Sequence, residues 1–365
     1  MGQAGGALAA QLEERYFRQK VKLGQGSFGT VWRAVDRQSG ENVAIKQLLK
    51  ANFTKRGVSR ADIEREMSLM KACNHRNITQ LLGFFENDTS LFLALEYCDS
   101  GDFGDKIREQ GLGITEAEAA AWVRQMCDAV CVLHTQGICH RDIKPENFMV
   151  HQRTNLKLSD FGLATGLQKG QLLQDVCGTR AFNAPEQHPI AVKNGGYGFP
   201  VDMWALGISV YLVMFGGRHP FMDENHHLDE TLMLAGKLDF RDRSSATGFL
   251  GLEGPNGIGL RFSEAARRFC RRLADPDQVR RIQAWEAVYE PWLKSGGGRI
   301  EEAEEPSSCI TSTRSERRSS SKGMLPPPCC SRAADRAKSM QLARILAVPT
   351  PLRRNGGPGP GEVRL

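Results

Sequence analysis

Two short polar segments constrain this chain more than any other feature of its sequence. Residues His140–Asn147 read HRDIKPEN, and Asp160–Gly162 read DFG, so that Asp160 follows Asn147 by thirteen positions. The carboxylate of Asp142 can accept a proton from a hydroxyl group, and Asn147 and Asp160 offer the oxygen ligands that Mg²⁺ prefers. A fold that uses these groups for one reaction must bring the two segments together.

Three further segments stand in order around this pair. Gly24–Val31 reads GQGSFGTV, Val43–Lys46 reads VAIK, and Ala184–Glu186 reads APE. A lone GxGxxG is weak evidence, because dinucleotide-binding folds also use it, but those folds continue directly into a helix. Here Thr30–Asp36 continues as a strand, so we expect a hairpin whose glycines let backbone amides approach phosphate oxygens.

The periodicity of the chain separates a β-rich part from a helical part. Residues 17–50 alternate polar and apolar side chains, as a twisted antiparallel sheet does, and Leu91–Tyr97 reads as another buried strand. The period changes at 59–73, which predicts a helix, and Thr115 with Glu118 forms a capping box that predicts the start of another. Further helices are predicted around 201–215, 228–235, 263–273 and 282–289.

In this order and spacing the five segments resemble the eukaryotic-type serine/threonine protein kinases. The RHPF sequence at Arg218–Phe221 is similar to the calcium/calmodulin-dependent and calcium-dependent branch. The resemblance covers roughly residues 16–293 and implies an α+β, bilobal fold. A small antiparallel β lobe with one main helix would occupy about 16–97, and a larger α-helical lobe about 98–293. The implied activity is phosphorylation of serine or threonine hydroxyls on protein substrates with ATP and Mg²⁺; a pseudokinase scaffold is the alternative.

The resemblance assigns chemical roles to the polar segments. Asp142 would be the base, Lys144 would stabilise charge on the transferring phosphate, and Asn147 and Asp160 would hold magnesium. Thr179 is expected to contact Asp142 and Lys144. We call His140–Asn147 the catalytic loop. A second DFG sequence, Asp102–Gly104, precedes this loop, whereas Asp160 follows it as the family pattern requires, so Asp160 is the predicted metal ligand.

The resemblance also implies a nucleotide site between the lobes. Lys46 would contact the α and β phosphates and pair with Glu66, with Glu64 of the same helix as the alternative. Asp102 resembles the acidic residue that reaches the ribose, and Leu95 would be the gatekeeper. The residues expected around the nucleotide are Leu23, Gly24, Gln25, Gly26, Ser27, Phe28, Gly29, Val31, Ala44, Lys46, Leu95, Glu96, Cys98, Asp102 and Met149.

Several supporting contacts follow from the same resemblance. Asp202 should anchor the backbone of the catalytic loop, and Glu186 should pair with Arg280 or, as the alternative, Arg281. Met70, Leu81, His140 and Phe161 resemble a stacked apolar spine, although ordinary core packing explains them equally well.

The chain between the DFG and APE sequences, residues 160–186, is called the activation segment, and it departs from the usual family pattern at one position. Thr165 is the only hydroxyl residue between Gly162 and Cys177, and it lies too close to the predicted metal site to be the usual phosphorylation switch. Asp175 occupies the position where many relatives carry a phosphorylatable threonine. Its carboxylate could pair permanently with Arg141 and replace a phosphate; a solvated loop aspartate is the alternative.

Substrates and partners are constrained by charge. The acidic residues Asp99, Asp102, Asp105 and Glu146 lie where a peptide would dock, which favours substrates with basic residues before the acceptor. The tail at 294–365 is predicted to be disordered, basic and rich in Ser, Pro and Gly, and it carries most of the net charge of +6. Within it, Asp335–Val348 could bind calmodulin or another regulatory protein.

Composition excludes other classes of protein. The longest apolar runs fall short of the roughly 18 residues of a membrane span, and because the basic excess lies in the tail, nucleic-acid binding is not expected. The ten cysteines include no CxxC pair, which favours an intracellular protein of the cytoplasm or nucleus. Residues 1–15 are expected to be a flexible leader, and 241–261 a surface insertion without an assigned role.

Overall fold

The computed structural model describes residues 11–25, 29–56, 59–168, 170–223, 225–240 and 262–294. Four predicted features lie wholly or mainly outside these residues. They are the glycine-loop residues Gly26, Ser27 and Phe28, most of the leader, the insertion at 241–261, and the tail from residue 295 onward.

The small lobe is a five-stranded antiparallel sheet with the strand order β1-β2-β3-β5-β4. Alternation along the strands gives the sheet two buried faces, because every second side chain points the same way. On one face Leu91 and Leu93 pack against Ile63 and Met67, and on the other face Ile45 lies in a second apolar cluster. The strands are β1 Tyr16–Gln25, β2 Gly29–Asp36, β3 Asn42–Leu49, β4 Leu81–Glu86 and β5 Ser90–Glu96.

Two helices accompany the sheet, α2 at Lys50–Arg56 and α3 at Arg60–Ala72. The helix predicted at 59–73 is α3, which Ser59 begins with a capping box to Asp62. The shorter α2 was not predicted, because seven residues are too few to show a helical apolar period.

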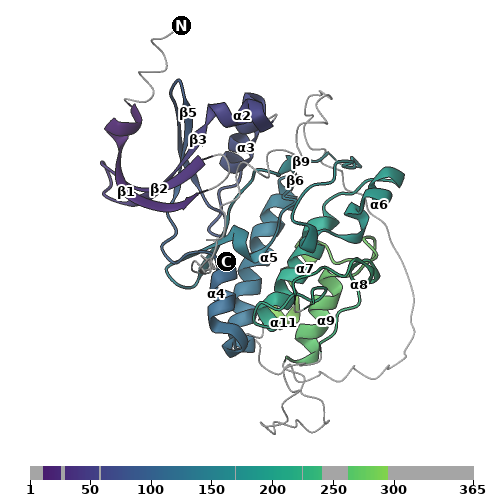
Figure 1. Cartoon of the computed structure of the whole chain (residues 1–365). Coiled ribbons are helices and arrows are strands. Elements are labelled where there is room, and N and C mark those ends of the chain that lie inside the picture. The colour runs from purple at the N-terminus through teal and green to yellow at the C-terminus, as the bar shows by residue number, and fades with distance from the viewer. Residues whose placement is uncertain are drawn as a thin grey trace, which may run out of the picture.

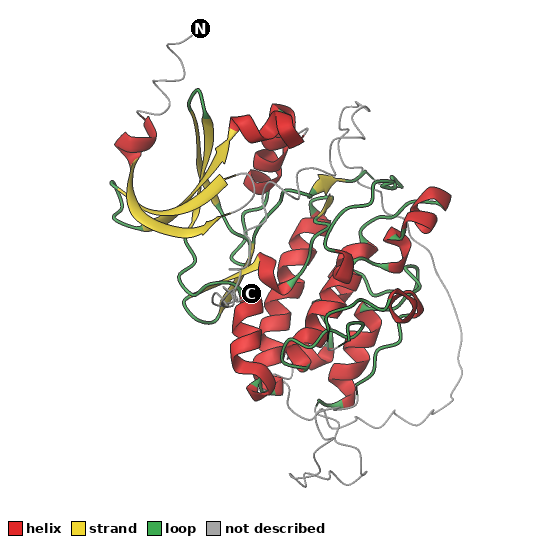
Figure 2. Ribbon diagram, viewed as in Figure 1, coloured by secondary structure: helices red, strands yellow, loops and turns green. Residues whose placement is uncertain are grey.

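The large lobe is mainly helical, as Figure 2 shows in red, while the strands in yellow gather in the small lobe. The core helix is α7, whose residues are almost all buried, and α5 and α9 pack against it. The helices are α4 Phe103–Gln110, α5 Glu116–Thr135, α6 Pro189–Asn194, α7 Pro200–Met214, α8 Glu230–Ala235, α9 Glu264–Leu273, α10 Ala284–Ala287 and α11 Pro291–Lys294.

The predicted helix boundaries lie within two residues of those in the structure. Thr115 forms the predicted capping box and begins α5. The helix predicted at 282–289 is only the four residues of α10, and the one predicted at 228–235 begins two residues later, as α8.

Short strands and turns complete the large lobe. They are the strands β6 Ile138–Cys139, β7 Phe148–His151, β8 Asn155–Leu158 and β9 Thr165–Gly166, and the 3-10 turns η1 Gly111–Gly113, η2 Pro145–Asn147, η3 Arg180–Phe182 and η4 Pro185–Gln187. Of these, β6 and β9 lie at the boundary between the lobes (Figure 1). The predicted α+β, bilobal fold is therefore confirmed. Among the described residues, no helix combines the length and apolar character needed to cross a membrane.

Candidate active site

The catalytic loop follows β6 and is held by a buried carboxylate beneath it. Asp202 at the start of α7 accepts hydrogen bonds from the backbone N–H groups of His140 and Arg141, each at 2.8 Å. Its Oδ2 also lies 2.9 Å from Nε2 of His134. The predicted anchoring role of Asp202 is confirmed. Arg141 has a φ of +66°, a left-handed conformation that a non-glycine residue keeps only when its surroundings impose it.

The carboxylate of Asp142 is the centre of a dense set of contacts. Its Oδ2 lies 2.8 Å from Nζ of Lys144, and its Oδ1 accepts hydrogen bonds from the hydroxyl and the N–H of Thr179 at 2.7 and 3.1 Å. Lys144 also donates to the hydroxyl of Thr179 at 2.7 Å, and Asn147 Nδ2 donates to Asp142 Oδ2 at 3.0 Å. The expected contact of Thr179 with both residues is present.

These contacts keep Asp142 ionised. Burial alone would raise the pKa of Asp142, but the charge of Lys144 and the hydrogen bonds from Lys144, Thr179 and Asn147 outweigh it, so the pKa lies below its ordinary value. The site therefore presents a carboxylate that can orient a hydroxyl group and accept its proton.

Asp160 is brought to this loop by its neighbour in the sequence. Ser159 donates two hydrogen bonds to the backbone carbonyl of Asn147, from its N–H at 2.8 Å and from its hydroxyl at 2.9 Å. The ring of Phe161 packs edge-on against His140, with centroids 5.4 Å apart. The two polar segments that the sequence singles out thus lie side by side.

The side chains of Asp160 and Asn147 fit a bound magnesium ion. Asp160 Oδ1 is shielded from solvent and accepts no hydrogen bond from the described residues. The Lys46 ammonium lies 3.8 Å from it, too far for a hydrogen bond, so this oxygen can still serve a bound cation. Asn147 turns its amide nitrogen toward Asp142, which leaves its amide oxygen for a ligand. The described residues hold no cluster of three or more His, Cys, Asp or Glu suited to a metal, and Mg²⁺ at phosphate sites commonly needs only one or two protein ligands.

Lys46 of β3 and Glu66 of α3 belong to the same polar group. Lys46 Nζ lies 3.8 Å from Asp160 Oδ1. Burial raises the pKa of Glu66 to about 8, the charge of Lys46 opposes this rise, and the charge of Asp160 adds to it. Glu64 instead lies on the outer face of α3, where it pairs with Arg60 at 2.7 Å. Of the two carboxylates considered for Lys46, the structure places only Glu66 close to it.

The register of the sheet aligns the residues predicted to surround the nucleotide. Val31 pairs with Lys46 across β2 and β3, and Ala44 pairs with Leu95 across β3 and β5. Met149 of β7 forms an isolated bridge with Asp102, which begins α4. One set of predicted residues therefore lies in the small-lobe sheet and the other at the start of the large lobe.

The glycine loop is described only at its two ends. Gly24 and Gln25 pair with Val31 and Thr30, and Leu23 just before them is 40% exposed and available to a ligand. A Cβ on Gly29 would lie 1.6 Å from the backbone oxygen of Gln47, so the closeness of β2 to β3 at this point requires glycine. The segments on both sides of the loop are paired antiparallel strands, as predicted for a hairpin, and no helix follows the loop directly.

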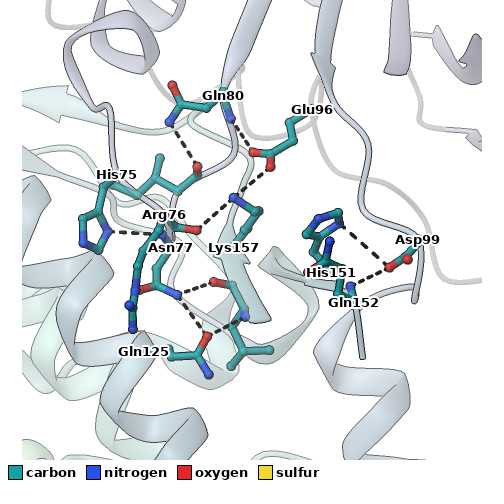
Figure 3. Close-up of polar contacts among 12 residues, drawn as sticks. His75, Arg76, Asn77, Gln80, Glu96, Asp99, Gln125, His151, Gln152 and Lys157 are labelled. Carbon is teal, nitrogen blue, oxygen red and sulfur yellow. Dashed lines mark hydrogen bonds and ion pairs between the residues drawn. The ribbon is translucent and has the colours of Figure 1, made fainter. Parts of the chain in front are cut away.

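A polar network joins the lobes at Glu96 (Figure 3). Glu96 ends β5, and we call the connection from Glu96 to Cys98, which leads into the large lobe, the hinge. Lys157 of β8 lies 2.8 Å from Oε1 of Glu96 and donates to the backbone carbonyl of Arg76 at 2.9 Å. Oε2 of Glu96 accepts a hydrogen bond from the N–H of Gln80 at 3.4 Å. Cys98 is partly buried, and burial raises the pKa of its thiol to about 12, so the thiol is neutral.

The second DFG sequence has a structural role. Asp102 caps α4 by accepting a hydrogen bond from the N–H of Asp105 at 2.9 Å. Phe103 is fully buried and packs edge-on against Trp122, with centroids 5.2 Å apart. Asp102 thus lies at the end of the hinge, while Asp160 lies at the catalytic loop.

The activation segment is tied to the catalytic loop through Asp175. Arg141 Nη1 donates to Asp175 Oδ2 at 2.7 Å, and the Arg141 side chain is only 1% exposed. The hydroxyl of Tyr197 donates to the backbone carbonyl of Asp175 at 2.7 Å. The alternative of a solvated loop aspartate is therefore wrong, because the Asp175 carboxylate has a buried cationic partner.

The partner of Glu186 is Arg281, and the first choice of Arg280 is wrong. Arg281 contacts both carboxylate oxygens of Glu186, at 2.5 and 3.0 Å, and also donates to the backbone carbonyl of Pro200. Arg280 is 70% exposed at its side chain and pairs with aspartates of its own loop. Two adjacent arginines offer the same chemistry, and only the direction of the loop decides between them.

Sequence reasoning missed several residues that shape the site. Ser159, Lys157 and Tyr197 each contact a predicted residue that lies far away in the chain. The position of Ser159 directly before Asp160 was the one available signal. No local spacing in the sequence indicates the contacts of Lys157 or Tyr197.

Comparison with known proteins matches residues 17–293 to the model of the protein kinase domain. The chain is 34% identical over 281 residues to calcium-dependent protein kinase 10 of Oryza sativa subsp. japonica, covering 76% of this chain and 43% of that protein. It is 34% identical over 302 residues to CBL-interacting protein kinase 24 of the same plant, covering 82% and 61%. It is 29% identical over 316 residues to calcium-dependent protein kinase 33 of Arabidopsis thaliana, covering 84% and 56%. The chain spans about half the length of these relatives.

Proposed function

The chain belongs to the protein kinase domain family, and on that basis we propose that it is a serine/threonine kinase. It would transfer the terminal phosphate of ATP to hydroxyl groups of protein substrates. The observation that carries this proposal is the setting of Asp142, whose ionised carboxylate contacts Lys144, Thr179 and Asn147 at once.

Each of these groups has a distinct task in the proposed reaction. Asp142 orients the acceptor hydroxyl and takes its proton, and Lys144 stabilises the negative charge of the phosphate in transit. Thr179 holds the activation segment against both residues, which favours a serine or threonine acceptor. Because phosphoryl transfer needs little covalent chemistry from the protein, this fixed geometry is the main contribution of the chain.

The nucleotide and its metal would meet residues from both lobes. Lys46, held near Glu66, positions the phosphates, and the side chains of Asn147 and Asp160 hold magnesium. The bound metal would neutralise the charge of the phosphate oxygens. The hinge residues Glu96 and Cys98 and the capping residue Asp102 lie where the base and ribose are expected.

Phosphate transfer from radiolabelled ATP to a serine peptide tests the proposal. Wild type should label the peptide, and Asp142→Asn should lower turnover by about 10²–10⁴-fold, the usual contribution of a positioned base. Asp128→Asn is the matched control, because Asp128 pairs with Arg124 on α5 and contacts none of these residues. Nucleotide binding by wild type without any transfer would instead identify a pseudokinase.

The Arg141–Asp175 ion pair supports a proposal about regulation. In the absence of a phosphate, the Asp175 carboxylate supplies the negative charge that holds the activation segment against Arg141. We therefore infer that activity does not require phosphorylation of this segment by another kinase.

Substrate and partner preferences are proposed from charge. Asp102, Asp105 and Glu146 lie together beside the catalytic loop, which supports a preference for basic residues before the acceptor. Binding of calmodulin or another regulatory protein at Asp335–Val348 stays a prediction, because the tail lies outside the described residues. The cysteines of the described part are free thiols, which fits the expected intracellular location.

A further inference from the structure

Three carboxylates and one guanidinium meet at the junction of α4 and the catalytic loop. Asp102 and Asp105 lie at the start of α4, Glu146 lies in η2, and Arg108 lies one turn further along α4. We call these four residues the α4 cluster. With all four groups ionised the cluster carries an excess of two negative charges.

Arg108 forms ion pairs with two of the three carboxylates, those of Asp105 and Glu146. Its Nη2 lies 2.6 Å from Asp105 Oδ1, and its Nη1 lies 3.2 Å from Glu146 Oε1. The other oxygen of that carboxylate, Glu146 Oε2, is shielded from solvent and accepts no hydrogen bond from the described residues. A guanidinium arriving from outside would therefore compete with Arg108 for Oε1 of Glu146.

Gly104 allows the carboxylates to gather at this point. A Cβ on Gly104 would lie 3.0 Å from Glu146 Oε1 and 3.1 Å from Asp102 Oδ1. The two carboxylate oxygens therefore both border the space that a side chain at position 104 would fill. Burial raises the pKa of Asp102, and the charges of Asp105 and Glu146 raise it further while Arg108 opposes them, as expected for one shared cluster.

The cluster is directly connected to the residues that would act on the acceptor. Glu146 lies between Lys144 and Asn147, and both of these contact Asp142. Glu146 follows Asp142 by only four residues, so the two side chains belong to one short loop and a peptide bound at Asp142 would have Glu146 within about 15 Å. The excess negative charge suits a basic side chain, and Arg108 already supplies one from within the chain.

We propose that Arg108 determines substrate specificity by occupying the acidic subsite that would otherwise bind an arginine of the substrate. This inference rests on the proposed kinase function and refines its preference for basic substrates. A substrate arginine would have to compete with Arg108 for Asp105 and Glu146, so wild type should favour arginine only weakly. Removing Arg108 should free both carboxylates and strengthen the preference.

Arg108 could instead be an ordinary helix-surface ion pair, since Asp105 lies three residues before it. That role would affect the stability of α4 and leave the choice of peptide unchanged. The ratio of kcat/KM for two peptides separates the two roles, because a general loss of activity cancels in the ratio.

The experiment uses serine peptides that differ only by arginine or glutamine at each of the five positions before the acceptor. The full-length proteins compared are wild type, Arg108→Gln, Arg108→Ala and Arg108→Lys. Arg124→Gln is the matched control, because Arg124 forms a similar surface pair with Asp128, four residues further along α5. Circular dichroism and thermal melting verify that each variant is folded.

We expect Arg108→Gln and Arg108→Ala to raise the arginine-over-glutamine ratio by about fivefold at one upstream position, equivalent to an ion pair of about 1 kcal/mol. Arg108→Lys and Arg124→Gln should keep the wild-type ratio, and adding Glu146→Gln to Arg108→Gln should abolish the gain. An unchanged ratio in folded, active Arg108 variants would overturn the inference while leaving the kinase proposal intact. A wild type that phosphorylates no peptide would remove both.

Discussion

The ion pair between Arg141 and Asp175 gives the sharpest test of how the activation segment is held. Replacing Asp175 by alanine leaves the guanidinium of Arg141, which is 1% exposed at its side chain, without its carboxylate. Removing one partner of a buried pair typically costs 3–5 kcal/mol, because the remaining charge stays buried and unpaired. The change should therefore release the segment from the catalytic loop.

Two features of the structure reduce this cost. Asp175 is 15% exposed at its side chain, so water can reach the guanidinium after the substitution. Arg141 also donates to the backbone carbonyl of Leu163 at 2.7 Å, and Tyr197 still holds the Asp175 backbone. We estimate a remaining cost of about 2 kcal/mol, which corresponds to a decrease in kcat/KM of up to about 30-fold.

The assay compares initial rates of peptide phosphorylation by wild type, Asp175→Ala and Asp175→Asn, with Asp128→Ala as the surface control. The initial rate of Asp175→Asn should lie between those of wild type and Asp175→Ala, because the asparagine amide keeps a hydrogen-bond acceptor but loses the charge. Intact-mass measurement before and after phosphatase treatment verifies that wild type acts without phosphate. Full activity in Asp175→Ala, or loss of wild-type activity after phosphatase treatment, would show that the Arg141–Asp175 pair does not hold the segment in its active position.

Two further predictions concern buried carboxylates. The pKa of Glu66 is about 8 in the folded protein against an ordinary 4.5, so the folded state binds its proton more tightly and the unfolding free energy should fall as pH rises between these values. Urea unfolding at pH 5.5 and pH 8 should show that Glu66→Gln reduces this fall by up to about 3 kcal/mol; equal pH dependence in both proteins would contradict it. Arg281→Ala should lower the unfolding free energy by about 3–5 kcal/mol, because its pair with Glu186 is buried. Arg280→Ala, at an exposed pair, should cost under about 1 kcal/mol, and equal losses in the two variants would be the contrary result.

The sequence predicted the parts of the fold that local pattern controls. The alternation at 17–50 predicted β1 to β3, and the capping box at Thr115 located the start of α5 within one residue. The ends of short helices were less accurate, since the four residues of α10 are held by packing and carry little periodic pattern. The short helix α2 was missed for the same reason.

The site was predictable wherever its residues share a segment. Asp142, Lys144 and Asn147 lie within six residues of chain, and their mutual contacts follow from that spacing. Contacts between distant segments could not be predicted from local pattern. The contact of Asp202 with the catalytic loop was predicted only through the family resemblance, and the Lys157–Glu96 ion pair was not predicted at all. The choice between Arg280 and Arg281 failed because it depends on the path of a loop that sequence pattern does not specify.

If Asp142 acts on the acceptor hydroxyl while other residues bind the nucleotide, its substitution should change turnover and leave nucleotide binding nearly intact. Nucleotide affinity and kcat are therefore measured on the same Asp142→Asn protein. We expect affinity for ATP with Mg²⁺ to stay within about twofold of wild type while kcat falls by about 10²–10⁴-fold. An Asp142→Asn protein that keeps wild-type kcat would show that Asp142 has no role in activating the acceptor.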